Sequence, residues 1–482
     1  MRLYSIGKIL IILLFVALPI AIINCFKYPE SSVSFPIGFL LLLCSLPFFL
    51  EKKREIYNPV LVLSAMFFIK YGLGSIYIYS YPSYFNRYLD LKILTKGLYF
   101  SIFCFISFLF GYYSINYSKL IRRIVSRIIS VIPNINKLDL KMTSLPITLL
   151  MLLSIGWGSR YLIIKFGAYY HLEAGQSALA TELIHFSQFV VFGSTLPLIA
   201  LCFAFLKFLE KKRRISLFFI TIILLISEIA YFLPSGSKEK VLLPIFILLV
   251  IYSIQERTPI KALFLSSTIF LLFIFPLVNI YKNYYTSRSV YDRFVEAIDI
   301  YGNSLLLFDI AVYKDILFSI FGERLNYAHI IGIIVENTPN IWNFQIGSTY
   351  VLFFTSLIPR VIWTGKPIIA GMGNEFGRSY GLIASNDYIT SVGMSWIGEL
   401  FINFGWFGIF FTFLYGLLYR VIFVYFFRNG RPNILGSVFY AFALFLVVRQ
   451  GMFAAQFSGL LKYYLVLLIV LIPFTKKVRE QN

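Results

Sequence analysis

Residues 211–233 read KKRRISLFFITIILLISEIAYFL, and this stretch decides the fold class. Four consecutive cations are followed by a long apolar run in which Glu228 carries the only charge. A helix needs about 20 apolar residues to cross the hydrocarbon core of a bilayer. Lys and Arg are preferentially retained on the cytoplasmic side of the membrane. The stretch therefore predicts a membrane-spanning helix that begins at the cytoplasmic face.

The composition of the whole chain agrees with this reading. The 482 residues are 59% hydrophobic and only 13% charged, and the mean hydropathy is +0.80. Soluble domains carry about 25% charged residues, so this chain could not cover a water-facing surface. We therefore expect an all-α polytopic membrane protein, which excludes a Rossmann, TIM or other soluble enzyme body. The net charge of +21 is expected to set topology, and no nucleic-acid partner is expected.

Apolar runs of spanning length predict about twelve transmembrane helices. They occupy residues 9–26, 33–50, 58–80, 97–117, 144–164, 186–208, 215–233, 240–255, 262–280, 400–425, 434–450 and 457–474. Basic clusters follow every second run and also end the chain, which predicts that both termini are cytoplasmic. The chain then divides into nine spans (1–280), a large extracytoplasmic loop (281–399), and three spans with a cytoplasmic tail (400–482).

The loop at 281–399 is the segment that departs from the pattern of short connections. Loops this long are uncommon unless they are functional or disordered. Its Trp, Tyr and Phe content indicates an ordered segment. Within it, IGSTYVLFFTSLIP (346–359) is too short to cross a membrane and predicts a re-entrant or interfacial helix.

Cations on the predicted outer side are the charges that topology does not explain. Two or three fixed cations at a membrane surface can neutralise a phosphate or a diphosphate, because Arg makes forked contacts and Lys acts as a point charge. The candidates for this role are Arg360, Lys366, Arg378, Arg288, Lys238 and Lys240. Contact with lipid headgroups is the alternative for the loop cations, and a solvated turn is the alternative for SGSKEK (235–240).

Three carboxylates in the same part of the chain are candidates for catalysis: Glu399, Glu375 and Asp387. A carboxylate can accept the proton of an attacking hydroxyl. Glu399 is the first choice because it directly precedes a long apolar run, where an acid is costly. Its alternative role is to cap a helix by interacting with the helix dipole.

Aromatic side chains in the loop offer faces on which sugar rings could pack. The candidates are Tyr350, Trp363, Tyr380 and Trp396, with Asn403 as a polar sugar contact. An interfacial aromatic belt would explain the Trp and Tyr residues equally well. We expect no metal site and no ATP or redox cofactor, because His and Cys lack motif spacing and no nucleotide-binding motif occurs.

A few charges fall inside the predicted spans. Arg160, Glu228 and Arg449 are functional candidates, or are paired with one another. Lys70 could extend to the membrane surface or join such a pair. The sequence leaves the pairing open.

Two motifs resemble a known family. The run I-P-R-x-x-W-x-x-K-P (Ile358–Pro367) followed by G-E-x-x-x-N-F-G (Gly398–Gly405) resembles bacterial O-antigen and capsular repeat-unit polymerases of the Wzy type. The arrangement of some dozen spans with one large late outer loop is also similar. The SGSKEK turn departs from the family, because Lys238 stands where an Arg is more usual.

The resemblance implies a GT-C-like membrane glycosyltransferase of the bacterial plasma membrane. The donor would be a growing glycan on undecaprenyl diphosphate, and the acceptor a lipid-linked repeat unit, with a chain-length regulator as a further partner. On this reading Arg360, Lys366 and Arg378 hold the diphosphate, and Glu399 is the general base, with Glu375 and Asp387 in reserve. The alternatives are an O-antigen ligase, for which His329 is the candidate histidine, a lipid-linked oligosaccharide flippase, and a scaffold without catalysis.

Overall fold

The computed structural model describes residues 33–51, 55, 57–80, 90–132, 135, 138–140, 145–166, 187–210, 214–235, 237–256, 274–283, 290–306, 314, 318, 325–359, 362–363, 365, 372–388, 390–428, 430–471 and 475–477. These residues form helices, with one short antiparallel pair of strands, β1 (Leu138–Leu140) and β2 (Thr475–Lys477). The predicted helical class is therefore confirmed for the described chain.

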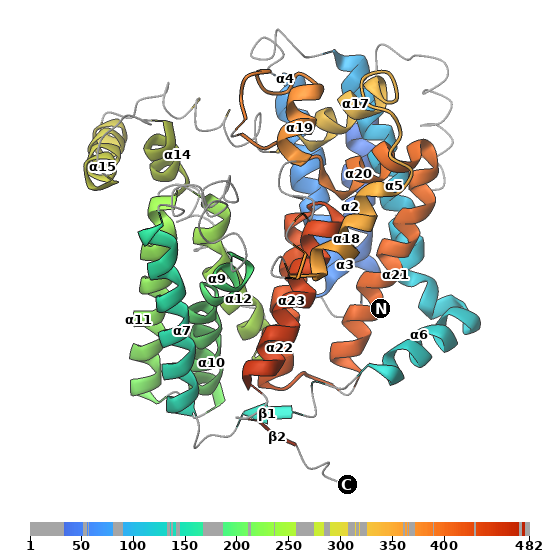
Figure 1. Ribbon diagram of the computed structural model, residues 1–482. Coiled ribbons are helices and arrows are strands. Elements are labelled where there is room, and N and C mark those ends of the chain that lie inside the picture. Colours follow the sequence, from blue (N-terminus) through green and yellow to red (C-terminus); the bar gives the residue numbers. More distant parts are fainter. Residues whose placement is uncertain are drawn as a thin grey trace.

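The helices form two groups that stand side by side (Figure 1). The first group, drawn in green, contains α7 (Leu145–Lys165), α9 (Ser187–Gly193), α10 (Leu196–Glu210), α11 (Ile215–Phe232) and α12 (Lys238–Gln255). The second group contains α2 (Ser34–Leu50), α3 (Pro59–Phe67), η1 (Phe68–Leu73), α4 (Gly74–Ser80), α5 (Leu91–Tyr117), α17 (Tyr327–Asn337), α18 (Ser348–Leu357), α19 (Met372–Ser379), α20 (Ser395–Phe404), η8 (Gly405–Phe407), α21 (Gly408–Phe427), α22 (Ile434–Arg449) and α23 (Phe453–Leu471). Outside the two groups are α6 (Lys119–Val131), α14 (Phe275–Asn283) and α15 (Val290–Leu306).

Within the described ranges, six helical segments are long and apolar enough to cross a membrane. They are Pro59–Tyr79, Leu91–Tyr117, Leu145–Lys165, Gln188–Glu210, Ile215–Ser235 and Ser395–Phe427. The predicted runs at 33–50 and 434–450 form the shorter apolar helices α2 and α22. The predicted span at 9–26 and most of 262–280 lie outside the described residues, so the number twelve stays a prediction.

The candidate span Ser395–Phe427 begins before residue 400, where the sequence analysis started it. It is bent at Gly405, whose φ of +57° lies in the region that glycine adopts without steric cost. The result is a short helix, α20, joined to the long helix α21. The predicted short helix at 346–359 is observed as α18.

Helices α5 and α21 are in backbone contact at two glycines. A Cβ atom on Gly416 would lie 2.1 Å from the carbonyl oxygen of Phe108, and one on Gly111 would lie 2.0 Å from that of Phe413. Small residues allow helix backbones to approach this closely in membrane proteins. The two glycines therefore set the separation of the central pair of helices.

Basic connections gather at one end of the molecule, which we call the basic end. There β1 pairs with β2, Arg428 donates to the Ile129 carbonyl of α6 at 3.3 Å, and Arg431 donates to the Gln255 carbonyl at 2.7 Å. The opposite end carries α4, α17 and α19 (Figure 1). This gathering follows the predicted alternation, and the membrane side that each end faces stays a prediction.

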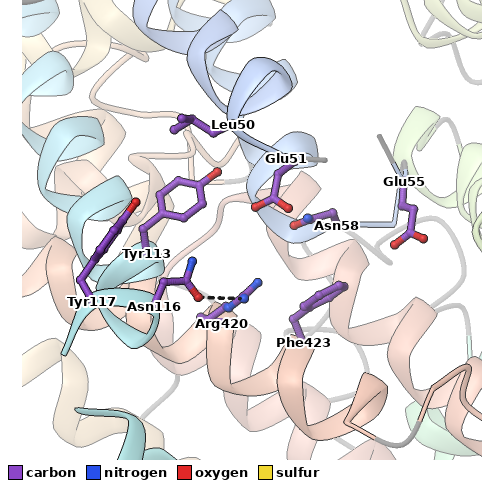
Figure 2. Close-up of a pocket in the computed structure, with 9 residues that line it drawn as sticks. All are labelled: Leu50, Glu51, Glu55, Asn58, Tyr113, Asn116, Tyr117, Arg420 and Phe423. Carbon is purple, nitrogen blue, oxygen red and sulfur yellow. Dashed lines mark hydrogen bonds between the residues drawn. The ribbon is translucent and has the colours of Figure 1, made fainter. Parts of the chain in front are cut away.

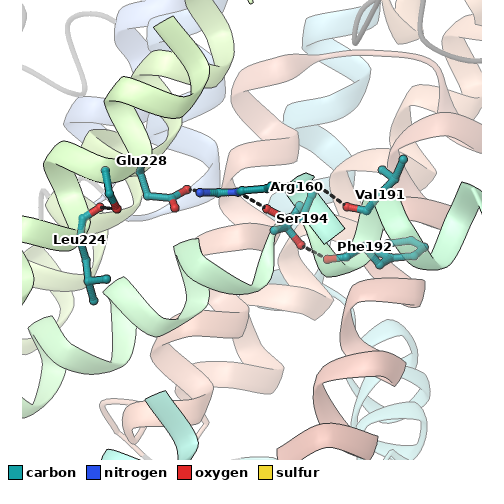
Figure 3. Close-up of polar contacts among 8 residues, drawn as sticks. Arg160, Val191, Phe192, Ser194, Leu224 and Glu228 are labelled. Atoms are coloured by element: carbon teal, nitrogen blue, oxygen red, sulfur yellow. Dashed lines mark hydrogen bonds and ion pairs between the residues drawn. The ribbon is translucent and has the colours of Figure 1, made fainter. Parts of the chain in front are cut away.

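Two charges inside the apolar helices of the first group are paired with each other (Figure 3). Arg160 Nη2 lies 2.8 Å from Glu228 Oε2, and the two side chains are 0% and 1% exposed. Arg160 Nε also donates to the Ser194 carbonyl at 3.0 Å, and the guanidinium lies 4.0 Å from the Tyr231 ring centroid. The structure thus assigns these two residues to one buried ion pair that ties α7 to α11.

Candidate functional site

The motif G-E-x-x-x-N sets Glu399 and Asn403 one turn apart on α20, so both side chains face the same neighbours. Glu399 is fully buried. Its Oε1 accepts a hydrogen bond from the Thr349 hydroxyl at 2.8 Å, and its Oε2 accepts one from the Phe453 backbone N–H at 2.7 Å. The carboxylate therefore joins α18, α20 and the start of α23.

Asn403 completes this junction. Its Nδ2 donates to the Thr349 hydroxyl at 2.8 Å and to the Glu399 carbonyl at 2.7 Å, while its Oδ1 accepts from the Gly347 N–H at 2.9 Å. The amide is buried and both of its polar atoms are engaged. Asn403 was predicted to contact sugar, but this bonding instead fixes the start of α18 against α20.

Glu399 differs from the other buried carboxylate. Among the described residues, Glu228 has Arg160 as its counter-ion, whereas Glu399 has no ion-pair partner. An acid at membrane depth without a counter-ion is costly and is a functional candidate by default. Glu399 therefore stays the first candidate for proton transfer.

Four cations lie at the end of α22 and the start of α12, and we call Lys70, Lys238, Lys240 and Arg449 the cation group. Lys70 lies in the π-helical segment η1 and donates to the Val448 carbonyl at 3.0 Å, with its Nζ 4.8 Å from the Tyr327 ring centroid. π-Helical turns occur frequently at functional sites. These contacts hold Lys70 against the carboxyl end of α22, next to Arg449.

Arg449 links the group to α12. Its Nε lies 3.3 Å from Glu239 Oε1, and both side chains are about half exposed. Glu239 stands between Lys238 and Lys240 at the start of α12, and Lys238 Nζ lies 3.6 Å from the Phe275 ring centroid. The cation group thus contains four positive charges, one of which, Arg449, is paired with Glu239.

A tight turn connects the cation group to Glu399. Gln450 follows Arg449, and its carbonyl accepts a hydrogen bond from the Trp396 N–H at 3.2 Å. Gln450 and Ser395 have φ values of +55° and +58°, in the left-handed region that non-glycine residues rarely adopt. Such strained residues cluster at active sites and ligand clamps. Here they lie on the two segments between the cations and the buried acid.

The helices that carry these residues run away from the basic end. Helix α12 has Gln255 at the basic end and Lys238 at its other terminus, and α22 runs from Ile434 beside the basic end to Arg449. The cation group and Glu399 therefore lie toward the end opposite the basic connections.

Several predicted site residues are engaged in holding the segment after α19. Arg378 Nε donates to Asn374 Oδ1 at 2.9 Å, and its guanidinium lies 4.4 Å from the Tyr388 ring centroid. Asp387 Oδ1 accepts from the Thr390 N–H at 2.8 Å. Glu375 is exposed on α19. Arg360, Lys366 and Arg288, predicted to bind diphosphate, lie outside the described residues.

The predicted sugar-binding aromatics are mostly packed in the interior. Trp396 is fully buried, with its ring stacked on Tyr415 at a centroid distance of 4.7 Å. Tyr380 is buried and shares a 2.7 Å hydrogen bond with the Thr338 hydroxyl, and burial raises the pKa of its phenol. This packing argues against a sugar-binding role for these two residues, because it leaves no ring face open.

Tyr350 and Trp363 differ from that pair. Tyr350 is half-buried between Phe404 and Phe453, with ring centroids 5.9 and 5.4 Å away. Trp363 is 39% exposed and stays available to a ligand. The aromatic content of the loop could not reveal that Trp396 and Tyr380 are buried, because their burial depends on the tertiary packing.

Lys70 and Arg449 are the residues of this site that sequence reasoning did not assign to it. The sequence did contain a signal for both residues, because Lys70 interrupts an apolar helix and Arg449 ends one. Within the described ranges, no three His, Cys, Asp or Glu side chains gather in a way that could hold a metal ion. The chemistry open to the described site is therefore anion binding by the cation group and proton transfer by Glu399.

A family model described as a domain of unknown function (DUF8712) matches residues 159–478, about two thirds of the chain. The matched region contains the Arg160–Glu228 pair, Glu399 and Arg449. Neither the curated proteins nor the solved structures contain a match to the chain.

Proposed function

The chain belongs to the DUF8712 family, and we propose that it is a membrane glycosyltransferase that joins oligosaccharide repeat units carried on undecaprenyl diphosphate. The proposed site of action is the outer face of the bacterial plasma membrane, with both termini in the cytoplasm. One observation carries the proposal. Glu399, a buried carboxylate without a counter-ion among the described residues, is connected through the Trp396–Gln450 hydrogen bond to the segment that carries Arg449 and contacts Lys70, at the end opposite the basic connections.

The chemistry of the proposed reaction uses both features. The leaving group is a diphosphate, and fixed cations stabilise the negative charge that develops on it. The nucleophile is a sugar hydroxyl, which needs a base to accept its proton. Because the donor is already activated, the transfer requires no nucleotide. In this proposal the cation group binds the diphosphate, and Glu399 accepts the proton.

The loop motif adds a second source of cations. Arg360 and Lys366, in the motif that resembles the Wzy-type polymerases, are proposed to supply further positive charge for the donor diphosphate. Of the aromatic residues predicted to bind sugar, Trp363 is exposed, and we propose that a sugar ring stacks on it. The proposal therefore assigns donor binding jointly to Lys70, Arg449 and the 358–367 motif.

Deletion of the gene tests the class of reaction. A polymerase predicts single capped repeats at the cell surface. Unmodified core with intact polymer on the lipid would instead identify a ligase, and repeats trapped inside the cell would identify a flippase. Either of these two outcomes would reject the proposal.

Complementation with variants tests the site. Lys70→Gln and Arg449→Gln are expected to lower the polymer signal about tenfold or more, since a hydrogen bond to a charged group contributes about 1.5–3 kcal/mol. Arg428→Gln is the matched control, because Arg428 bonds the Ile129 carbonyl at the basic end. Wild-type ladders from the first two variants, at normal protein level, would remove the cation group from the proposal.

A further inference from the structure

A polar cavity lies at the basic end, away from the proposed glycosyltransfer site. It has a volume of about 410 Å³ and lies between the end of α2, the start of α3 and the carboxyl-terminal turns of α5 and α21 (Figure 2). Its lining contains Glu51, Glu55 and Arg420, together with Tyr113 and Tyr117. The cavity therefore presents charges of both signs among the ends of four apolar helices.

The guanidinium of Arg420 has N–H donors that are weakly bonded or have no hydrogen-bond partner among the described residues. It lies seven residues before the end of α21 at Phe427, which is roughly 10 Å along the helix axis. Its two terminal nitrogens make long hydrogen bonds of 3.5 Å, to the Tyr112 hydroxyl and to Asn116 Oδ1. Its Nε is buried and has no hydrogen-bond partner among the described residues.

An arginine at this depth is costly unless its charge is compensated. Within the part of the chain that the structure describes, Arg420 forms no ion pair with a carboxylate. Planar guanidinium groups bind phosphate through forked hydrogen bonds. The incompletely satisfied guanidinium therefore indicates an anionic group in the cavity.

The carboxylates indicate a cationic group in the same cavity. Neither Glu51 nor Glu55 forms an ion pair with a described residue. Figure 2 shows the Glu51 carboxylate and the Arg420 guanidinium directed into the same space from different helices. Glu55 lies further along the lining, beyond Asn58 in this view, so Glu51 and Arg420 are the pair that complements a ligand with one cation and one anion.

The mouth of the cavity suits a lipid. Leu50 and Tyr117, which line it, are 40% and 86% exposed, and Phe423 adds a further apolar wall. Tyr is enriched at membrane–water interfaces, where its ring is apolar and its hydroxyl is wet. Acyl chains could leave the cavity past Leu50, while the headgroup stays among the charged side chains.

We propose that this cavity binds the headgroup of an aminophospholipid of the phosphatidylethanolamine type. The primary ammonium lies against Glu51, with Glu55 adding negative charge to the same lining, and the phosphate lies against Arg420. A primary ammonium donates three hydrogen bonds to carboxylates, whereas a choline headgroup donates none. The site therefore discriminates ethanolamine from choline lipids, and it is independent of the proposed glycosyltransfer.

The test is lipid-dependent thermal stability of the full chain, purified and stripped of lipid in detergent. Phosphatidylethanolamine should raise the unfolding temperature in a saturable way, and phosphatidylcholine and phosphatidylglycerol should raise it much less. Equal shifts from the ethanolamine and choline lipids would overturn the proposal. A full shift from soluble phosphoethanolamine alone would reassign the cavity to a soluble zwitterion, which also overturns the lipid assignment.

Variants locate the effect. The double variant Glu51→Gln/Glu55→Gln and the single variant Arg420→Gln should each weaken the ethanolamine-lipid response at least tenfold in midpoint concentration. Glu256→Gln, an exposed acid at the same end, and Arg428→Gln are the matched controls. If Arg420→Gln does not fold, the double variant still decides, because an unchanged lipid response in it would reject the site.

Discussion

The Glu399 carboxylate accepts a hydrogen bond from the Thr349 hydroxyl at 2.8 Å, across a contact between two helices that are 50 residues apart in the sequence. The Thr349 hydroxyl also accepts a hydrogen bond from the Asn403 side-chain amide. One threonine therefore connects the candidate base to the residue that fixes α18. The contact gives Glu399 a structural role alongside its proposed chemical role. The two roles predict different results on mutation.

Substitution of Glu399 and Thr349 separates these roles. Glu399→Gln keeps the side-chain volume but removes the base, and we expect about a hundredfold or greater loss of polymer formation, the scale of general-base catalysis. Thr349→Val should lower stability by about 1–3 kcal/mol while most activity remains. Polysaccharide ladders and thermal unfolding in detergent measure the two effects. Equal loss of activity in both variants would show that Glu399 acts through packing alone.

The buried Arg160–Glu228 pair predicts a non-additive stability change. Removing one partner, as in Glu228→Ala, leaves an uncompensated buried charge and should cost about 3–5 kcal/mol. The double variant Arg160→Leu/Glu228→Leu removes both charges and should recover much of that loss. Thermal unfolding and the yield of folded protein in detergent provide the comparison. A double variant as unstable as the sum of the single variants would contradict the pairing seen in Figure 3.

Glycine substitutions test the contact between α5 and α21. Gly416→Ala introduces a Cβ 2.1 Å from the Phe108 carbonyl oxygen, so the helices must separate, at a cost of about 1–3 kcal/mol or more. Gly158→Ala, in α7, is the control, because a Cβ there meets nothing within 4 Å. Unfolding temperatures of the two variants should differ clearly. Equal temperatures would mean that the backbones are further apart than described.

Sidedness can be tested with two matched serines. Ser385, six residues after the end of α19, and Ser130, on α6, are both exposed. Helices α19 and α6 lie at opposite ends of the molecule (Figure 1). With Cys25 replaced by serine, an impermeant thiol reagent should label Ser385→Cys in intact cells and Ser130→Cys only after the membrane is opened. The native Cys44, Cys104 and Cys202 are buried and should give little background. The reverse labelling pattern would invert the proposed topology.

The positions of many helices could be predicted from the sequence. The runs at 144–164 and 215–233 correspond to α7 and α11 within one residue at each end, and the run at 97–117 corresponds to α5, which begins six residues earlier, at Leu91. Their ends are marked by changes in hydropathy and charge, which are local properties of the chain. The short helix α18 was predictable for the same reason, since its apolar run is too short to span.

The membership of the candidate site depended on the tertiary structure. Glu399 was identified from its position before an apolar run, yet the sequence could not show that Thr349 and Phe453 bond it. It also could not show that Lys70 lies against the end of α22 near Arg449. Similarly, Trp396 and Tyr380 have the composition of ligand-facing aromatics but lie in the packed interior.

By itself, the sequence determined that the chain is helical, with apolar segments long enough to span a membrane, because hydrophobicity acts along each segment separately. Only the tertiary structure decided that Arg160 meets Glu228, that Lys70 and Arg449 join the start of α12, and that Glu399 is buried without a counter-ion among the described residues. The physical reason is that these outcomes depend on which helix faces pack together. That choice is made by close contacts between residues distant in sequence, such as Gly416 and Phe108.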